Sequence, residues 1–294
     1  MSNLTDRYIN PLTDFGFKKL FGTEPNKDLL IDFLNQILPE RHQIKDLNYA
    51  KNEQLGQAEL DRKAVFDLYC IGKSGERFIV EVQKAKQNYF KDRSIYYASF
   101  PIQEQAKKGD WDFRQDPVYT VGVLDFIFDD HKNEEGLLHL IELKNERCEV
   151  FYDKLKFIYI ELPKFKKTQE ELESHFDKWL YVFRHLSELQ DRPQQLQDRI
   201  FQKLFDAAEI AKFSQVERAA YEESLKYYRD IKNVIDTSRE EGLEEGIEEG
   251  RKEGRKEGRK ERTLEIARAL RDNAIPIDMI MKSTGLSKEE IERL

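Results

Sequence analysis

The sequence has few of the features that define disulfide-rich, zinc-finger or membrane proteins. It contains only two cysteines, Cys70 and Cys148, so neither a disulfide framework nor a cysteine-based zinc site is expected. No apolar run approaches the roughly 20 residues that a bilayer-spanning helix needs. The N-terminus also lacks the apolar core of a signal peptide. These absences predict a cytoplasmic protein with no membrane partner.

Positive charge is not in excess either. The net charge is −8 and the pI is about 5.4, which argues against a general nucleic-acid binder. Hydrophobic residues make up 39% and charged residues 36% of the chain, as in a globular protein with a highly charged surface. At 294 residues, the chain is long enough for a substantial core and more than one folding unit.

The most informative segment is VFDLYCIGKSGERFIVEVQ, residues 65–83. Two runs rich in β-branched and aromatic residues flank a Gly-Lys-Ser-Gly turn, which predicts a β-hairpin. If the turn centres on Ser74, Asp67 lies directly opposite Glu81, with Cβ atoms about 5 Å apart. Two like charges in this position are unfavourable unless a positive charge lies between them.

A divalent cation is one explanation for that pair. Oxygen ligands at this separation suit Mg²⁺ or Mn²⁺, which need only one or two protein carboxylates. Gln83 follows Glu81 on the same face, where its amide can orient a water molecule or donate to a phosphate. The alternative is a solvated strand face with two incidental acids, and the spacing alone leaves both open.

Alternation along the hairpin predicts its buried side. Side chains on one face are expected to enter the core, and those on the other to accompany Asp67 and Glu81. The predicted core set is Phe66, Leu68, Cys70, Val80 and Val82.

The rest of the first half of the chain reads as α/β. Residues 1–165 have helical spacing over 27–38. Further strands are predicted over 118–126 and 157–162, of which the first is dense in apolar residues and expected to be central. Residues 166–237 read as a helical extension. Its apolar stripe is expected in the core and comprises Phe176, Trp179, Leu180 and Phe183.

Residues 238–262 carry glycines at a strict period of four between charged residues. Glycine in a helix costs about 1 kcal/mol relative to alanine, but Glu and Lys or Arg three residues apart favour a helix. A linker and a marginal helix both remain open. Residues 263–294 read as a small helical module with a break at Pro276 and a capping box from Ser287. The module resembles a helix-turn-helix, but its acidic last helix favours oligomerisation or docking over entry into a DNA groove.

Three further charged residues are candidates for the same site. Asp14 precedes a helical run and is expected to be its N-cap, with a role as an additional metal ligand as the second interpretation. Lys84 and Lys86 follow the motif in a basic segment, so we expect them to contact a phosphate backbone. The tyrosines of that segment are expected to pack on the sheet.

The order Asp67, hairpin, Glu81-Val82-Gln83 resembles the D…ExQ variant of the PD-(D/E)XK nuclease core, in which Gln replaces the usual Lys. Further segments resemble, in the same order, the Rpn-type family of recombination-promoting nucleases and transposases. These segments are 10–22, 89–105, 117–126, 161–165 and 177–179. The resemblance extends over nearly the whole chain, including the Glu/Gly-rich tail.

The resemblance implies an α/β, restriction-endonuclease-like core, with a mixed sheet flanked by helices and a C-terminal helical extension. It implies Mg²⁺- or Mn²⁺-dependent DNA cleavage that promotes recombination, with Asp67 and Glu81 as metal ligands and Gln83 as the third motif residue. The alternative is a catalytically silent DNA-binding or protein-assembly module that retains the fold. A homo-oligomer formed through the C-terminal helical tail is a further expectation.

Overall fold

The computed structural model describes residues 6–50, 53–54, 64–106 and 112–294. Its contacts divide the chain into two units, Met1–Lys232 and Asn233–Leu294.

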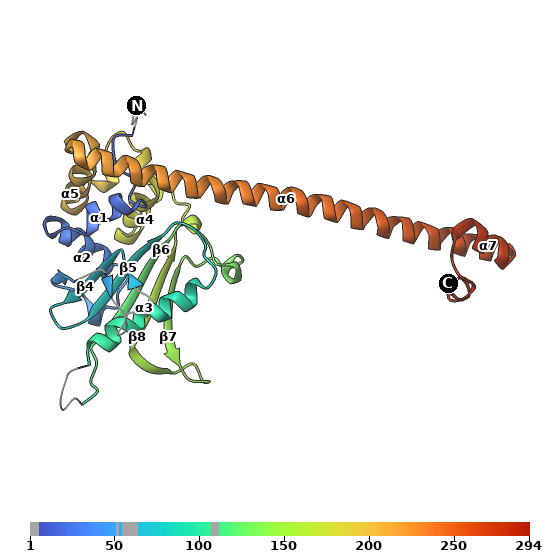
Figure 1. Ribbon diagram of the computed structural model, residues 1–294, viewed down its shortest axis with the longest axis horizontal. Helices are drawn as coiled ribbons and strands as arrows, with labels where there is room; N and C mark the ends of the chain where they lie inside the picture. The colour runs from blue at the N-terminus through green and yellow to red at the C-terminus, as the bar shows by residue number, and fades with distance from the viewer. Residues whose placement is uncertain (1–5, 51–52, 55–63, 107–111) are drawn as a thin grey trace. The chain divides into compact units, whose positions relative to one another are not determined.

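A six-stranded mixed sheet organises the first unit (Figure 1). Strands β4, β5, β6 and β8 form its middle, with β5, β6 and β8 parallel and the remaining neighbours antiparallel. The sheet order is β1 (Leu47–Tyr49), β4 (Leu68–Gly72), β5 (Arg77–Gln83), β6 (Val118–Leu124), β8 (Val150–Glu161) and β7 (Leu138–Lys144). A separate short pair joins β2 (Glu53–Gln54) to β3 (Ala64–Val65).

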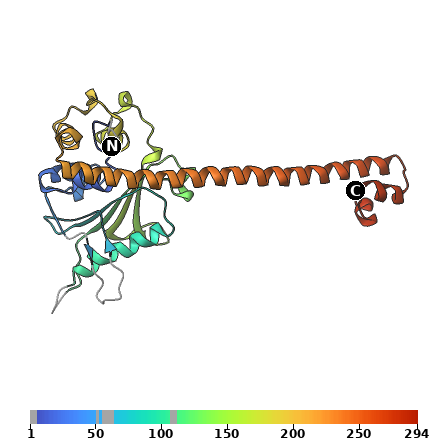
Figure 2. The same ribbon diagram turned by 45° about the horizontal axis from the view of Figure 1, so that its top comes forward.

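The expected central strand is confirmed as β6, whose seven residues are all buried. Such complete burial requires cover on both faces of the sheet. Helix α3 (Phe90–Glu104) covers one face, and Figure 2 shows it on the opposite side of the sheet from the other helices of this unit. Those helices are α1 (Asp14–Phe21), α2 (Lys27–Asn35), α4 (His175–His185) and α5 (Arg199–Ala208).

Short 3₁₀ turns join these elements. They are η1 (Glu24–Asn26), η2 (Glu40–His42), η3 (Asp129–His131), η4 (Leu162–Lys164), η5 (Gln169–Glu171), η6 (Leu186–Glu188), η7 (Gln194–Leu196) and η8 (Ile210–Lys212). Helix α2 is therefore three residues shorter than the predicted 27–38, because the chain turns before Pro39.

The hairpin has the predicted register. Leu68 pairs with Val80 and Ile71 with Arg77, as a turn centred on Ser74 requires. Leu68 is buried in the core between the sheet and α1, α2, α4 and α5, as predicted. Phe66 is not on that face.

Phe66 packs instead against Tyr69 and Ile79, on the face beneath α3. The prediction for this residue was wrong because regular strand geometry begins only at Leu68. Just before it, β3 pairs with β2 in a different sheet, so the alternation is interrupted at Phe66 and Asp67.

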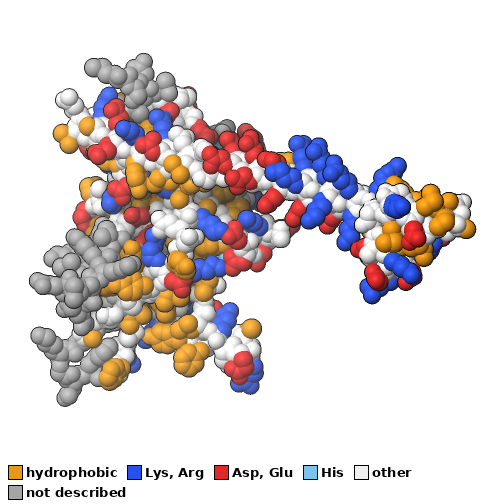
Figure 3. Space-filling model, turned by 45° about the vertical axis from the view of Figure 1, so that its right-hand side comes forward, with side chains coloured by type: hydrophobic (Ala, Val, Ile, Leu, Met, Phe, Trp, Pro, Cys, Tyr) orange, Lys and Arg blue, Asp and Glu red, His pale blue; other side chains and the backbone are white. Residues whose placement is uncertain are grey.

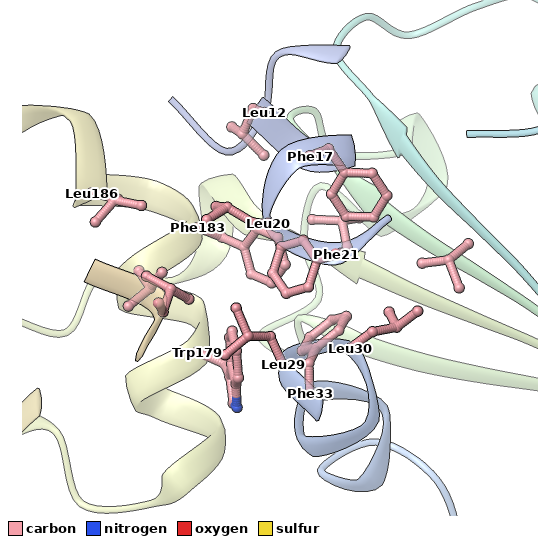
Figure 4. Close-up of a cluster of buried hydrophobic side chains, with 14 of the residues drawn as sticks. Leu12, Phe17, Leu20, Phe21, Leu29, Leu30, Phe33, Trp179, Phe183 and Leu186 are labelled. Atoms are coloured by element: carbon pink, nitrogen blue, oxygen red, sulfur yellow. The ribbon is translucent and has the colours of Figure 1, made fainter. Parts of the chain in front are cut away.

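Aromatic side chains fill the core between the helices and the sheet (Figure 4). Phe183 stacks on Phe21 with ring centroids 5.4 Å apart and meets Phe33 edge-on at 4.9 Å. Trp179 is fully buried, and its Nε1 donates a hydrogen bond to Asp32 at 3.0 Å. The apolar stripe expected in the core is thus confirmed, although Phe176 at its start is only partly buried.

The long helix α6 (Gln215–Asp272) begins in the first unit. Tyr221 is fully buried there, and its hydroxyl accepts the backbone N–H of Asn10 at 2.8 Å. The Ser224 hydroxyl accepts the N–H of Phe15 at 3.1 Å. These contacts attach the first turns of α6 to the segment that leads into α1.

The second unit contains the remainder of α6 together with α7 (Ile277–Thr284) and α8 (Lys288–Glu292). The glycine-rich segment 238–262 is helical. Residues before the predicted break at Pro276 form the end of α6, and the two short helices α7 and α8 follow it. The capping box of Ser287 and Glu290 is present as predicted. A small core of Ala267, Ile280 and Ile291 holds the module together.

Among the described residues, no helix is both long enough and apolar enough to cross a membrane.

Candidate active site

The Asp67 carboxylate lies where the β4–β5 ladder ends. Backbone pairing stops at Leu68 and Val80. Beyond that point, the Asp67 Oδ2 atom accepts the backbone N–H of Val82 at 2.8 Å. The fold therefore fixes this carboxylate beside β5, within electrostatic range of Glu81.

Glu81 lies in β5 and is only 8% exposed. Burial raises the pKa of its carboxyl to about 7, with a further upward contribution from Asp67 and an opposing one from Arg93. Burial also raises the pKa of Asp67, which the Val82 hydrogen bond opposes and Asp14 reinforces. Both carboxyls are desolvated, and Asp67 further disfavours ionisation of Glu81, so the pair forms a site suited to a cation.

Arg93, from the first turn of α3, supplies part of the positive charge beside these carboxylates. Its Nη2 atom is 2.7 Å from Gln83 Oε1 and 3.7 Å from Glu81 Oε2. The guanidinium carbon lies 5.3 Å from the Phe90 ring centroid and 5.6 Å from that of Tyr97. The guanidinium is thus held by aromatic rings beside the motif.

The sequence motif does not identify Arg93 as part of this site. The position of this residue depends on how α3 packs on the sheet, which no local pattern reveals. The weak signal available was a cation close behind an acidic pair in the sequence.

The Gln83 side chain is engaged at both ends. Its oxygen accepts from Arg93, and its Nε2 donates to the carbonyl of Ala85 at 3.0 Å. The amide is therefore oriented by neighbours from two different segments.

A cavity of about 890 Å³ opens beside Asp67. Its walls come from α1, the end of β5 and the start of α6, all in the first unit. Among the candidate residues, its lining contains Asp14, Asp67, Gln83 and Lys84, but neither Glu81 nor Lys86. The structure therefore gathers four of the six candidates at one cavity and places Glu81 behind them, against α3.

The N-cap prediction for Asp14 was wrong. Thr13 has the extended backbone of a cap, and its hydroxyl accepts the N–H of Gly16 at 3.0 Å. Asp14 is the first residue of the helix and forms an ion pair of 2.8 Å with Lys18. Its carboxylate is left facing the cavity shared with Asp67.

The two lysines have different surroundings. Lys84 Nζ lies 5.3 Å and 5.5 Å from the ring centroids of Tyr227 and Tyr228, at the start of α6. Burial lowers the pKa of Lys84. Lys86 is outside the cavity and forms an ion pair with Asp129 of η3.

The tyrosines of the basic segment were expected on the sheet, which holds only in part. Tyr97 packs with the cluster under α3, whereas Tyr89 is 80% exposed and Tyr96 is 42% exposed.

The mixed sheet with helices on both faces and the motif at the end of the hairpin define a nuclease-type α/β fold. Residues 11–238 match the family described as PD-(D/E)XK nuclease family transposase. Residues 260–294 match the C-terminal HTH domain of the Rpn/YhgA-like nuclease family. Since the first match covers more than half of the chain, the protein belongs to the Rpn-type PD-(D/E)XK nuclease family. No curated protein and no solved structure matches.

The matches confirm the family and fold that the D…ExQ motif implied. They also confirm that the helices around Pro276 follow a helix-turn-helix pattern.

Proposed function

We propose that the protein hydrolyses DNA phosphodiester bonds with Mg²⁺ or Mn²⁺ as its cofactor, in reactions that promote recombination. The observation that carries the proposal is the pair of neighbouring carboxylates at the end of the hairpin of a PD-(D/E)XK fold, with Glu81 buried and Asp67 half-buried.

The donor set fits such an ion. Both groups are hard oxygen donors. Burial raises the pKa of each carboxyl, and a bound cation would favour the ionised forms. Asp67 and Glu81 would hold the ion, with Asp14 as an additional candidate from the wall of the same cavity. When bound, the ion supplies a lower pKa for its water and neutralises charge on a phosphoryl oxygen.

The other residues position the substrate. The Lys84 ammonium faces the cavity and can attract a phosphate oxygen, while its contact with Tyr227 and Tyr228 limits how far it moves. Arg93 orients the Gln83 amide, which can donate to the attacking water or to the phosphate. Lys86 would contact the phosphate backbone outside the cavity once released from Asp129.

A test is cleavage of supercoiled plasmid by the wild-type protein, Asp67→Ala and Glu81→Ala, with Mg²⁺, Mn²⁺ or EDTA. Glu146→Ala is a matched control, because Glu146 is an exposed acid in the β7–β8 turn. We expect cleavage by the wild type and by the control only, and only with metal. Equal cutting by all four proteins would refute the assignment.

The alternative is a catalytically silent DNA-binding or protein-assembly module that retains the nuclease fold. The C-terminal HTH domain favours it, since such a domain can bind DNA without any contribution from Asp67. Retained DNA binding without cleavage by the wild type would support this alternative.

Self-association is a further proposal, and the charge order of α6 supports it. Glu240, Glu241, Glu244, Glu245, Glu248 and Glu249 precede Gly250, and Arg251, Lys252, Arg255, Lys256, Arg259 and Lys260 follow it. Figure 3 shows these as an acidic and then a basic stretch.

The order is antisymmetric about Gly250. If residue numbers that sum to 500 are paired, as in an antiparallel helix pair centred there, each of those six glutamates lies at the same level along the axis as a lysine or arginine of the partner helix. Glycines 242, 246 and 250 then face 258, 254 and 250. A Cβ at any of these glycines would meet nothing within 4 Å. A second copy of the same helix is therefore a partner of matching charge that could approach closely.

A further inference from the structure

Outside the nuclease motif, two imidazoles and one carboxylate converge in the first unit. His131 comes from η3, His139 from β7 and Glu161 from the last position of β8. His131 Nδ1 is 3.1 Å from Glu161 Oε1, and His139 Nε2 is 3.0 Å from Glu161 Oε2. The two rings are stacked, with centroids 4.1 Å apart. Residues from three different elements thus present three ligand atoms within 4.8 Å of one another.

The hydrogen bonds of Glu161 leave room for a metal ion. The carboxylate is fully buried and accepts four contacts, from His131, from His139, from Lys164 at 2.7 Å and from the N–H of Phe128 at 2.8 Å. A cation bound by the two imidazoles would replace the two histidine contacts. Lys164 and the Phe128 N–H would continue to orient the carboxylate, as outer-shell groups do in metal sites.

The exposure of the two histidines and the types of ligand atom are both consistent with a metal site. The side chains of His131 and His139 remain 18% and 14% exposed, so an ion can reach their nitrogens from solvent. Two imidazole nitrogens and one carboxylate oxygen suit Zn²⁺ better than Mg²⁺, which prefers oxygen ligands and keeps most of its water.

We propose that His131, His139 and Glu161 form a Zn²⁺ site, with solvent as the fourth ligand. It is separate from the carboxylate pair of the nuclease motif. Gln83, Leu124 and Glu161 are consecutive partners across β5, β6 and β8, so two strand spacings, about 10 Å, separate the ends of the motif and of this site. That is too far for a two-metal centre, whose ions are about 4 Å apart.

The position of η3 indicates what the ion would do. Asp130 of η3 forms an ion pair of 2.6 Å with Lys91 at the start of α3, and Asp129 pairs with Lys86. Lys91 also lies 4.8 Å from the ring centroid of Phe128. A cation that ties His131 to β7 and β8 would fix η3, and through it the basic segment after Gln83. This effect on the basic segment rests on the proposed function, whereas the ion site itself does not.

The experiment is metal binding by the full-length protein without DNA. Zn²⁺ affinity is measured by competition with a chromophoric chelator, and Co²⁺ is added as a spectroscopic probe of imidazole ligation. The variants are His139→Ala, His131→Ala and Glu161→Gln. His185→Ala is the matched control, because His185 also pairs with a glutamate, Glu188, but has no second histidine beside it. Asp67→Ala removes the other site.

We expect one equivalent of Zn²⁺ bound by the wild type, His185→Ala and Asp67→Ala. Loss of either histidine should weaken binding by more than about 100-fold, beyond the effect of losing an outer-shell partner. Circular dichroism checks that each variant is folded. If Glu161→Gln does not fold, the two histidine variants still test the proposal.

Unchanged Zn²⁺ affinity in both histidine variants would overturn the proposal, as would loss of the bound equivalent in Asp67→Ala alone. An absence of Zn²⁺ binding by the wild type would overturn it as well. None of these outcomes depends on whether the protein cuts DNA.

Discussion

At the scale of single residues, ionisation of Glu81 is expected to reduce the stability of the folded protein. Its carboxyl is buried beside Asp67, and its pKa is raised to about 7. Without metal, the folded protein therefore favours the protonated form of Glu81 below pH 7. The contribution of Glu81 to stability is fully present below its ordinary pKa near 4.5 and is lost as the pH rises through 7.

Glu81→Gln, which mimics the protonated form, should therefore stabilise the metal-free protein at pH 8 by roughly 1–3 kcal/mol. At pH 4.5 the two proteins should be equally stable. Urea unfolding in EDTA at both pH values measures the difference. A constant difference across this range would show that Glu81 ionises normally.

Arg93 contributes positive charge to the same pair. Because its Nη2 lies 3.7 Å from Glu81, it competes electrostatically with an incoming cation. Arg93→Met should tighten Mn²⁺ binding by several-fold in calorimetry while reducing cleavage, since Gln83 loses its partner. Lys91→Met is the control, because Lys91 pairs with Asp130 instead. Equal Mn²⁺ affinity in wild type and Arg93→Met would contradict this role.

Sequence could predict the part of the candidate site that lies within one hairpin. Turn chemistry fixed the register of the hairpin, which placed Asp67 just beyond the last pair, where its carboxylate accepts the N–H of Val82. Arg93 and the pair of His131 and His139 could not be found in this way. Their positions depend on how α3 and η3 pack against the sheet, which is a matter of tertiary contact.

At the scale of elements, the start of α1 depends on Thr13. Its buried hydroxyl accepts from Gly16 at 3.0 Å and donates to the carbonyl of Asn10 at 2.8 Å. Thr13→Val keeps the shape but removes both bonds, and should destabilise the protein by about 1–2 kcal/mol in urea unfolding.

Thr13→Ser retains the hydroxyl and should cost less than Thr13→Val. Asp14→Ala should change stability little, because it removes only an exposed pair with Lys18. A larger loss from Asp14→Ala than from Thr13→Val would restore Asp14 as the cap.

Elements with strong apolar patterns were predictable and others were not. Strand β6 is rich in apolar residues, which predicted its central position. Strand β7 is mostly exposed, and the first half of β8 is exposed or half-buried. Neither segment therefore has the alternation of buried and exposed residues from which a strand can be predicted. The sequence left residues 238–262, now part of α6, open between a linker and a helix. Glycine disfavours a helix there and the ion pairs favour one, and neither effect decides the outcome alone.

At the scale of the whole molecule, the glycines of α6 provide a test of self-association. Within one chain, a side chain at Gly250 would meet nothing within 4 Å. Gly250→Leu should therefore favour the helix itself while keeping a partner helix at a distance. We expect a wild-type dimer in light scattering at low salt, weakened by 0.5 M NaCl, and a largely monomeric variant.

Gly136→Leu is the matched control, because that glycine also has open space around it but lies in the first unit. A monomeric wild type at low salt, or a dimer that Gly250→Leu leaves intact, would exclude the antiparallel pairing.

The attachment of α6 to the first unit also determines which fragments of this protein can persist. Tyr221 and Ser224 bind backbone groups near α1, and Tyr228 donates to Asp125 just beyond β6 at 2.9 Å. A protease that cuts the exposed helix beyond Lys232 would release a nuclease fragment with these contacts intact. A cut near Phe213 would instead remove the acceptors of two half-buried N–H groups, those of Asn10 and Phe15, and one wall of the cavity. Limited digestion should therefore leave a fragment that is longer than the sheet and its covering helices alone.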